Sequence, residues 1–365
     1  MLSGGYVSHF PSIKATAFLS TLSLSQVLAD PAPTAEDTKH DFDAYVLQEE
    51  KKELDVFISA DLLIWQANES GLTYAFTMKG IDTAAFDLGE GPASSPKFRW
   101  EPGARITLGY HTPHDKWDTS LGWTWFYDQA SGHTSASAAG SVLFPSFIHP
   151  AQALLHHATE GVTAHNGSGH WKLNLNLVDW ELGRVIHTSK KFSIRPFMGL
   201  RTAWVFQRYQ IEYTDVDTLS GQDLFDEYET DMHNNFWGLG VRAGFTTHWS
   251  IKNHFTLYAN LALSILYGFF SLTDTEEGDE AVLLKTTDSF RSSRAISDLQ
   301  LGLGWNKMFC NNKLRLSLLA CWEHHMFFSQ NQFLRFTDGF MPGQVIQNQG
   351  DLAIQGWSLS AKIGF

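Results

Sequence analysis

Apolar and polar residues alternate with a period of two through most of the chain, beginning near Asp55. In an extended strand, this period places apolar side chains on one face and polar side chains on the other. The pattern continues to the last residue, and chain ends fray unless a sheet holds them, so we expect a final strand. Its predicted apolar face consists of Trp357, Leu359, Ala361, Ile363 and Phe365.

Eleven segments carry this alternation and are separated by turn-forming residues. Several exceed the about five or six residues usual for globular strands and reach the about 9 to 11 tilted residues that cross a bilayer. Their length therefore favours strands of a membrane barrel. The predicted strands are 55–66, 72–79, 98–111, 117–128, 171–187, 192–213, 234–250, 254–272, 295–309, 313–329 and 351–365.

The connections between these segments alternate between short turns and long loops, as in outer-membrane barrels with short periplasmic turns and long outer loops. We therefore predict an all-β fold, a transmembrane antiparallel β-barrel. Single-chain bacterial barrels usually have an even number of strands, so we expect about 12, with the missing strand within 41–54 or from a division of 55–79. The predicted long loops are 81–97, 130–170, 214–233, 273–294 and 330–350.

Two features of the pattern leave alternatives. In the segment 171–187 the apolar set changes from odd to even positions near Val178 and Asp179, which we interpret as a β-bulge. The uncharged run 255–272 is long enough for a transmembrane helix, but its polar residues recur with a period of two and favour a strand. A large soluble β-sandwich is the alternative for the whole chain, and strand length and the terminal Phe365 favour the barrel.

Composition agrees with a membrane environment. Aromatic residues make up 14% of the chain and charged residues only 18%, against about 25% in an ordinary soluble domain. Trp and Tyr gather near predicted strand ends, where outer-membrane lipid and lipopolysaccharide would meet water. The net charge of −13 argues against a nucleic-acid partner. Two cysteines are too few for a disulfide framework.

The N-terminal region predicts export. An apolar run after Lys14 ends with Val27 and Ala29 at the small-residue positions of a signal-peptidase site. We therefore predict a signal peptide over 1–29, a charged periplasmic leader over 30–54, and the barrel over 55–365.

Seven segments in order resemble the MOMP-like pore-forming outer-membrane proteins of chlamydia-related and legionella-type bacteria. The resemblance covers nearly the whole predicted mature chain, and it implies an outer-membrane pore without known catalytic residues. The segments are ADLLIWQANESGLTYA, ARITLGYHTPHDKWDTSLGWTWF, WKLNLNLVDWELGR, SIRPFMGLRTAWV, NNFWGLGVRAGF, LALSILYG and LRLSLLACWEHHMFFSQNQF.

Charged residues at predicted inward positions are candidates to line the pore, although salt bridges that brace the wall would use the same residues. We expect a porin for passive diffusion of ions and small hydrophilic solutes. An adhesin or receptor acting through the long outer loops is the alternative, and a barrel enzyme is the third hypothesis. The pore-lining candidates are Asp61, Arg105, Asp118, Lys172, Arg195, Arg201, Arg242, Asp298, Arg315, Glu323 and Lys362.

No residue pattern indicates catalysis, so we expect no enzymatic activity and no cofactor. The run 214–233 contains seven carboxylates that could hold Ca²⁺ or Mg²⁺, but a solvated acidic loop is favoured, and we predict no metal site. The barrel-assembly machinery is an expected partner, and an oligomer is compatible with the pattern. The residues predicted to form the assembly signal are Trp357, Leu359, Ile363 and Phe365.

Overall fold

The alternating segments form long antiparallel strands. A computed structural model describes residues 55–80, 89–112, 116–138, 140–149, 151–152, 161–251, 254–309, 314–336, 345–347 and 350–365. The predicted signal peptide (1–29) and leader (30–54) lie outside the described residues.

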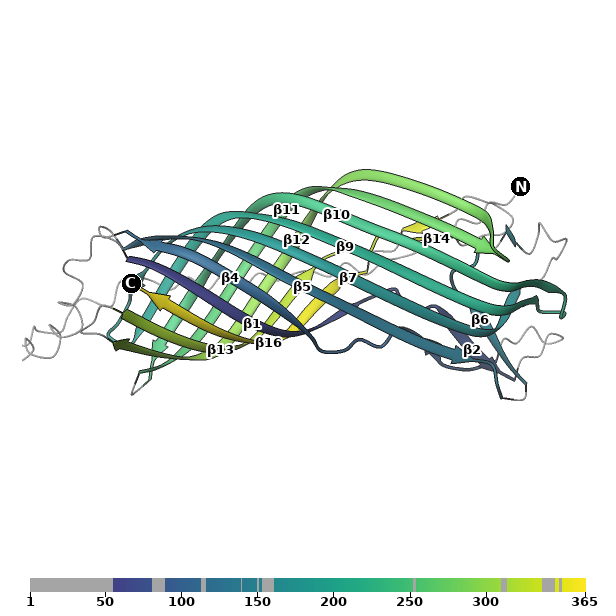
Figure 1. Cartoon of the computed structure of the whole chain (residues 1–365), viewed down its shortest axis with the longest axis horizontal. Helices are drawn as coiled ribbons and strands as arrows, with labels where there is room; N and C mark the ends of the chain where they lie inside the picture. Colours follow the sequence, from purple (N-terminus) through teal and green to yellow (C-terminus); the bar gives the residue numbers. More distant parts are fainter. Residues whose placement is uncertain are drawn as a thin grey trace, which may run out of the picture. The chain divides into compact units, whose positions relative to one another are not determined.

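Ten strands close into a ring, in which each is paired with its neighbour in the order of the chain and the last, β16, pairs with the first, β1. They cross the barrel at a steep tilt, and the C-terminus lies at one end (Figure 1). This confirms the predicted antiparallel β-barrel. The ring strands are β1 (Asp55–Glu69), β4 (Glu101–His111), β5 (Trp117–Ser135), β7 (Val162–Arg184), β9 (Phe192–Thr218), β10 (Asp223–Ser250), β11 (Phe255–Gly278), β12 (Ala281–Phe309), β13 (Leu314–Phe327) and β16 (Leu352–Gly364).

In the part of the chain that the structure describes, six short strands lie outside the ring. Three of them, β2 (Ala75–Lys79), β3 (Ala93–Ser94) and β6 (Ser141–Pro145), pair with one another and reach β7 at the end of the barrel far from the C-terminus (Figure 1). A second small sheet pairs β14 (Leu334–Phe336) with β15 (Val345–Gln347), and β8 (Ile186–His187) pairs with the start of β9.

The prediction of about 12 strands is wrong, because the ring contains ten. Each of the eleven predicted segments contains a strand, but 72–79 corresponds to β2, which pairs outside the ring. No strand has to be added before β1, because β1 is already paired along both edges, with β16 and with β4. The expectation of an even number holds.

The uncharged run 255–272 is a strand, as the period of its polar residues predicted, and it forms most of β11. Among the residues that the structure describes, no helix is long and apolar enough to cross a membrane.

Two predicted long loops, 214–233 and 273–294, are instead continuations of strands. The first covers the end of β9, the turn 219–222 and the start of β10, and the second covers the end of β11, a tight turn and much of β12. Asp279 and Glu280 form that tight turn with φ values of 49° and 64°, the backbone that suits a two-residue hairpin. In 214–233 the acidic residues suggested a loop, but most of them face outward and alternate with inward side chains such as Tyr228 and Met232, so they extend the strands.

Polarity inverts along β7. Near the C-terminal end of the barrel, Val178, Trp180 and Leu182 face outward, and Asp179 and Glu181 face the lumen. Nearer the far end, the apolar residues face inward and the polar residues outward. The inward residues there are Trp171, Leu173, Leu175 and Leu177, and the outward ones are Lys172, Asn174 and Asn176.

The predicted β-bulge at Val178 and Asp179 is therefore wrong. The register between β5 and β7 continues without a shift from Trp117↔Arg184 to Ser135↔Asn166. The apolar residues move from odd to even positions because the surroundings of the strand change from water to lipid. The backbone itself continues without a shift. We call the part with an apolar outer face, residues 178–184 on β7, the girdle half, and the part with a polar outer face, residues 162–177 on β7, the distal half.

The girdle half has the height that a bilayer requires. On β10 the outward residues are apolar or aromatic from Trp237 to Trp249, apart from Thr247, a span of 13 residues. This span covers the about 9 to 11 tilted residues needed to cross the hydrocarbon. At the distal border, the Trp322 ring contacts those of Trp100 and Trp357 in edge-to-face geometry, with centroids 5.9 and 5.3 Å apart. Aromatic rings at this position are typical of the membrane–water interface.

The apolar core of the protein fills the distal half of the lumen. Side chains from nine of the ten ring strands form one buried cluster, which includes Trp65, Phe126, Trp171 and Phe236. Each of these four is at most 1% exposed. The distal half is thus packed like the interior of a soluble protein, while the girdle half is polar inside.

Candidate functional site

The lumen of the girdle half contains a connected group of charged side chains, which we call the lumen network. Asp298 on β12 lies at its centre, accepting from Arg201 Nη1 at 2.8 Å, from His325 Nδ1 at 2.7 Å and from Arg242. Asp298 is only 1% exposed. Two guanidinium groups and one imidazole therefore stabilise one buried carboxylate.

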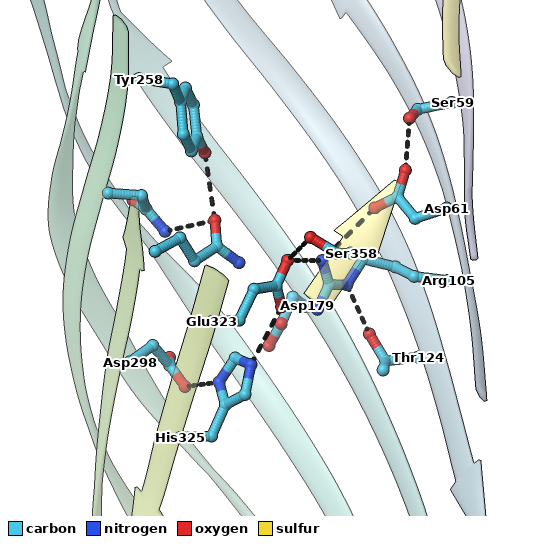
Figure 2. Close-up of polar contacts among 12 residues, drawn as sticks. Ser59, Asp61, Arg105, Thr124, Asp179, Tyr258, Asp298, Glu323, His325 and Ser358 are labelled. Atoms are coloured by element: carbon cyan, nitrogen blue, oxygen red, sulfur yellow. Dashed lines mark hydrogen bonds and ion pairs between the residues drawn. The ribbon is translucent and has the colours of Figure 1, made fainter. Parts of the chain in front are cut away.

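Glu323 on β13 extends the network to the opposite wall. Arg105 Nη2 donates to Glu323 Oε2 at 2.8 Å, and its Nη1 reaches Asp61 at 3.3 Å (Figure 2). His325 Nε2 lies 3.1 Å from Glu323 Oε2, so this imidazole bridges Glu323 and Asp298. The Ser358 hydroxyl donates to Glu323 Oε1 at 2.5 Å. Figure 2 shows Arg105 between its carboxylate partners and Thr124.

A third branch runs through Glu181 on β7. Arg242 Nε lies 3.2 Å from Glu181 Oε1, and Arg195 Nη1 lies 3.2 Å from its Oε2. Arg195 also holds Asp118 through both carboxylate oxygens. In total the network joins six carboxylates, four guanidinium groups and one imidazole from eight of the ten ring strands.

Strand register explains part of this arrangement. Asp61 is directly opposite Arg105, and Asp179 is directly opposite Arg201, whose guanidinium binds it at 2.6 and 2.7 Å. Opposite charges in such cross-strand pairs stabilise a sheet. The contact from Arg201 to Asp298 instead joins β9 to β12, with two strands between them. The network therefore braces the wall and also crosses the lumen.

The lumen network surrounds a polar cavity of about 220 Å³. Neutral groups complete its lining: the Asn260 amide and the Tyr258 hydroxyl both donate to Gln300 Oε1, at 3.2 and 3.1 Å. Because a water takes about 30 Å³ in the liquid, the cavity has room for several. It suits water and small ions.

The structure brings eight of the eleven pore-lining candidates into the lumen network. Lys362 also faces inward, with its ammonium 3.3 Å from the centroid of the Phe57 ring, and Arg315 lies exposed near the C-terminal end. Lys172 is the exception, because it faces outward on the distal half of β7, and its inward assignment is wrong. The eight residues are Asp61, Arg105, Asp118, Arg195, Arg201, Arg242, Asp298 and Glu323.

Asp179 and Glu181 were missing from the sequence-based candidates, and the interpretation of a bulge was the cause. With a bulge at Val178, alternation no longer indicates whether the next side chains face the lumen or the lipid. The outward Trp180 between the two carboxylates was the signal that could have assigned them to the lumen. Whether any of these residues lines an open pore stays a prediction.

Segments from three outer connections close the far end of the lumen. We call residues 70–75, 146–149 and 329–334 the plug. Side chains of β9 and β10 donate hydrogen bonds to backbone carbonyl groups of the plug, with donor–acceptor distances of 2.6 to 3.0 Å. The pairs are Tyr209 with Leu72, Tyr213 with Tyr74, Thr230 with Phe147, and Asn234 with Gln330. Sequence reasoning missed Thr230 because it treated 214–233 as a solvated loop. The other three donors lie at the ends of the predicted strands 192–213 and 234–250, and the pattern gave no reason to single them out.

The predicted assembly signal lies on the lipid side of the closing strand. Trp357, Leu359 and Phe365 are exposed outward residues of the stripe, and Ile363 shares their face. The backbone N–H of Phe365 donates to Val56 O at 3.0 Å, so the last residue is held by β1. Within the described parts of the chain, no three His, Cys, Asp or Glu side chains converge as a metal-binding group.

The chain was compared with known proteins. No curated protein matches the chain. Among solved structures, the outer membrane protease OmpT from Escherichia coli is 8% identical with a TM-score of 0.38, covering 87% of this chain and 99% of its own. A Pseudomonas aeruginosa FadL homologue is 7% identical with a TM-score of 0.29, covering 86% and 90%. These values are too low to support an argument about fold or function.

A family model gives the firm assignment. The model described as the Legionella pneumophila major outer membrane protein precursor matches residues 47–365, most of the chain. The match agrees with the closed ring, the apolar girdle and the aromatic border. The chain therefore belongs to the Legionella major outer membrane protein family and is an integral β-barrel of the bacterial outer membrane.

Proposed function

We propose that the chain is a narrow pore for passive diffusion of ions and small hydrophilic solutes, and that the conformation described here is its closed state. The observation that carries the proposal is the polar cavity of about 220 Å³ at membrane depth, surrounded by the lumen network. A barrel stabilised only by its core has no need of so many charges in its lumen. The proposed role requires no catalytic step, and we assign no catalytic residue.

The apolar core of the distal half defines how such a pore would work. Apolar constrictions in channels block ions by excluding water, and they conduct when their side chains separate. The core, which includes plug residues such as Tyr74 and Phe333, fills the lumen beyond the polar cavity, so ions would pass only during such separations. We therefore propose a pore that is closed most of the time.

We expect single-channel recordings of the refolded protein to show brief, discrete conductance steps with a preference for cations. The preference follows from the six carboxylates of the lumen network against its four guanidinium groups. Arg315→Glu adds negative charge near the periplasmic end without breaking the network, and it should strengthen the preference, measured as reversal potential in a KCl gradient. Arg291→Glu, on the outer face of β12, is the matched control. A folded barrel without conductance contradicts the proposal.

The second candidate is an adhesin or receptor. It is favoured by the projection of β9 to β12 beyond the girdle, where their outer faces are polar and acidic. Removing the connection 136–161, which spares the ring strands β5 and β7, would abolish binding to a host surface while leaving the conductance of a pore in place.

We expect deletion of Phe365 to lower the fraction of protein inserted into the outer membrane of cells. The proposed reason is that the barrel-assembly machinery reads the outward stripe of β16, whose last side chain is Phe365. Phe365→Tyr keeps an aromatic side chain at this position and should insert normally. Insertion is measured by heat-modifiable migration of outer-membrane fractions on gels. Equal insertion of the deletion variant and the unmodified chain would rule out this signal.

A further inference from the structure

Two carboxyl groups are buried in the distal half, away from the lumen network. Asp274 and Glu276 are two residues apart on β11, so both face inward, and they are 2% and 1% exposed. Their outward neighbours Thr273, Thr275 and Glu277 are polar. This part of β11 therefore lies beyond the apolar girdle, outside the membrane.

Hydrogen bonds occupy only some of the acceptor oxygens of these carboxyl groups. Glu276 Oε2 accepts from the Tyr228 hydroxyl and from the backbone N–H of His149, the latter at 3.1 Å. Asp274 Oδ1 has no hydrogen-bond partner among the described residues, although it is buried. Thr230 lies directly opposite Glu276 on β10. An unpartnered carboxylate oxygen at such depth needs a further ligand.

The two carboxyl groups also lack a compensating charge. In the described parts of the chain, no basic side chain forms an ion pair with either of them. Arg335 is near, but its Nε donates to Ser146 O at 3.1 Å and its guanidinium lies over the Phe147 ring. His149 Nδ1 accepts from the N–H of Ala151 at 3.0 Å, and burial lowers the pKa of this imidazole.

Burial raises the pKa of Asp274 to about 8 and that of Glu276 to about 7, and the charge of Glu276 adds to the rise at Asp274. Asp231, on the outer face of β10, adds to the effect on Asp274. Two such groups are stable only when they bind protons or when a bound cation neutralises them.

A small cavity of about 10 Å³ adjoins the pair. This is the volume that one water or one monatomic ion occupies by the same measure. Its polar lining consists of Asp274, Glu276, Thr230, His149 and Arg335. Because Phe147 O accepts from the Thr230 hydroxyl at 3.0 Å, the oxygen of that hydroxyl keeps lone pairs for a cation.

We propose that this cavity is a Ca²⁺ site, formed by the carboxylates of Asp274 and Glu276 together with neutral oxygen atoms such as the Thr230 hydroxyl. Ca²⁺ prefers oxygen ligands in flexible geometry and matches the two negative charges. Mg²⁺ usually retains several waters, for which a cavity of this size has no room. The bound ion would link β11 to residues 146–149 of the plug. The site is independent of whether the barrel conducts.

Equilibrium dialysis of the full-length refolded chain in detergent against ⁴⁵Ca²⁺ tests the site. We expect one Ca²⁺ per chain, with affinity at least about tenfold weaker in Asp274→Asn and in Glu276→Gln, because each loses a charged ligand. Glu277→Gln is the matched control, since it removes a charge from the outer face of the same strand and should bind Ca²⁺ normally. The proposal is overturned if the unmodified chain binds no Ca²⁺, or if Asp274→Asn binds it as tightly as the unmodified chain does.

A second measurement uses only the unmodified chain and so does not depend on the folding of variants. Protons and Ca²⁺ compete for the same carboxylate oxygens, and without either ligand the two buried charges destabilise the folded barrel at high pH. Ca²⁺ should restore the temperature of heat modification at pH 8 and have less effect at pH 5. Equal temperatures with Ca²⁺ and with EDTA at pH 8 would mean that the pair only binds protons.

Discussion

Replacement of Asp298 by asparagine is expected to lower the free energy of unfolding by about 3–5 kcal/mol, the cost of removing one partner from a buried ion pair. Arg201, Arg242 and His325 all contact this carboxylate in the lumen. Asparagine keeps the size of the side chain but not its charge, so Arg201 and Arg242 each retain a single carboxylate partner. Urea unfolding in lipid vesicles, followed by tryptophan fluorescence, measures the loss.

Asp231→Asn is the matched control for this experiment. It breaks the pair between Arg208 and Asp231, whose side chains are 40% and 25% exposed on the outer face of the distal half. Exposed pairs of this kind contribute about 0–1 kcal/mol. If the two variants lost equal stability, the lumen charges would be solvated individually instead of depending on one another.

Simultaneous replacement of Phe236 and Phe270 by alanine is expected to increase the conductance of the barrel several-fold. The two residues are a cross-strand pair of β10 and β11, with ring centroids 4.6 Å apart and almost no exposure. The Phe236 ring lies against Gly238 and Gly268, where an added Cβ would come within 2.6 and 2.4 Å of it. The apolar core closes the lumen, and removing both rings therefore opens a gap in it.

The same double variant should also be less stable, by about 3–5 kcal/mol for each buried Phe→Ala replacement. Phe245→Ala is the control, because Phe245 is 40% exposed on the lipid face of the same strand and does not contribute to the core. Planar-bilayer recordings of the three proteins make the comparison. Unchanged conductance in a correctly folded double variant would place the closure in the plug instead of the core.

Alternation alone predicted the strands, because each strand of the barrel separates two different environments. It predicted the outward stripe of β16 up to Phe365 and most of the charged lumen residues. It could not predict how Arg201 on β9 reaches Asp298 on β12, since contacts across a lumen depend on barrel size and tilt and not on local pattern. The ring size itself was misjudged because β2 has the alternation of a wall strand but pairs elsewhere.

The errors on β7, β9 and β11 have one physical cause. We assumed that apolar side chains face lipid along the whole of each strand, but beyond the girdle water is outside and the core is inside. Tyr209, Ile211 and Tyr213 continue the alternation of β9 with inward, buried side chains. A change of parity without a change of register, as at Leu177 and Val178, is thus a signal for the edge of the membrane.

The inversion of polarity along the strands also fixes how deep the barrel sits in the bilayer. Sinking by two residues, about 6.6 Å along a strand, would bring Asn176, Arg208 and Asn235 against hydrocarbon. Rising by the same amount would expose the outward apolar residues of the girdle to water. Since a basic side chain facing lipid costs up to about 2–4 kcal/mol at mid-membrane and ten strands move together, axial sliding is opposed in both directions. The barrel is held at one depth by its own sequence, with no need of an anchor outside the membrane.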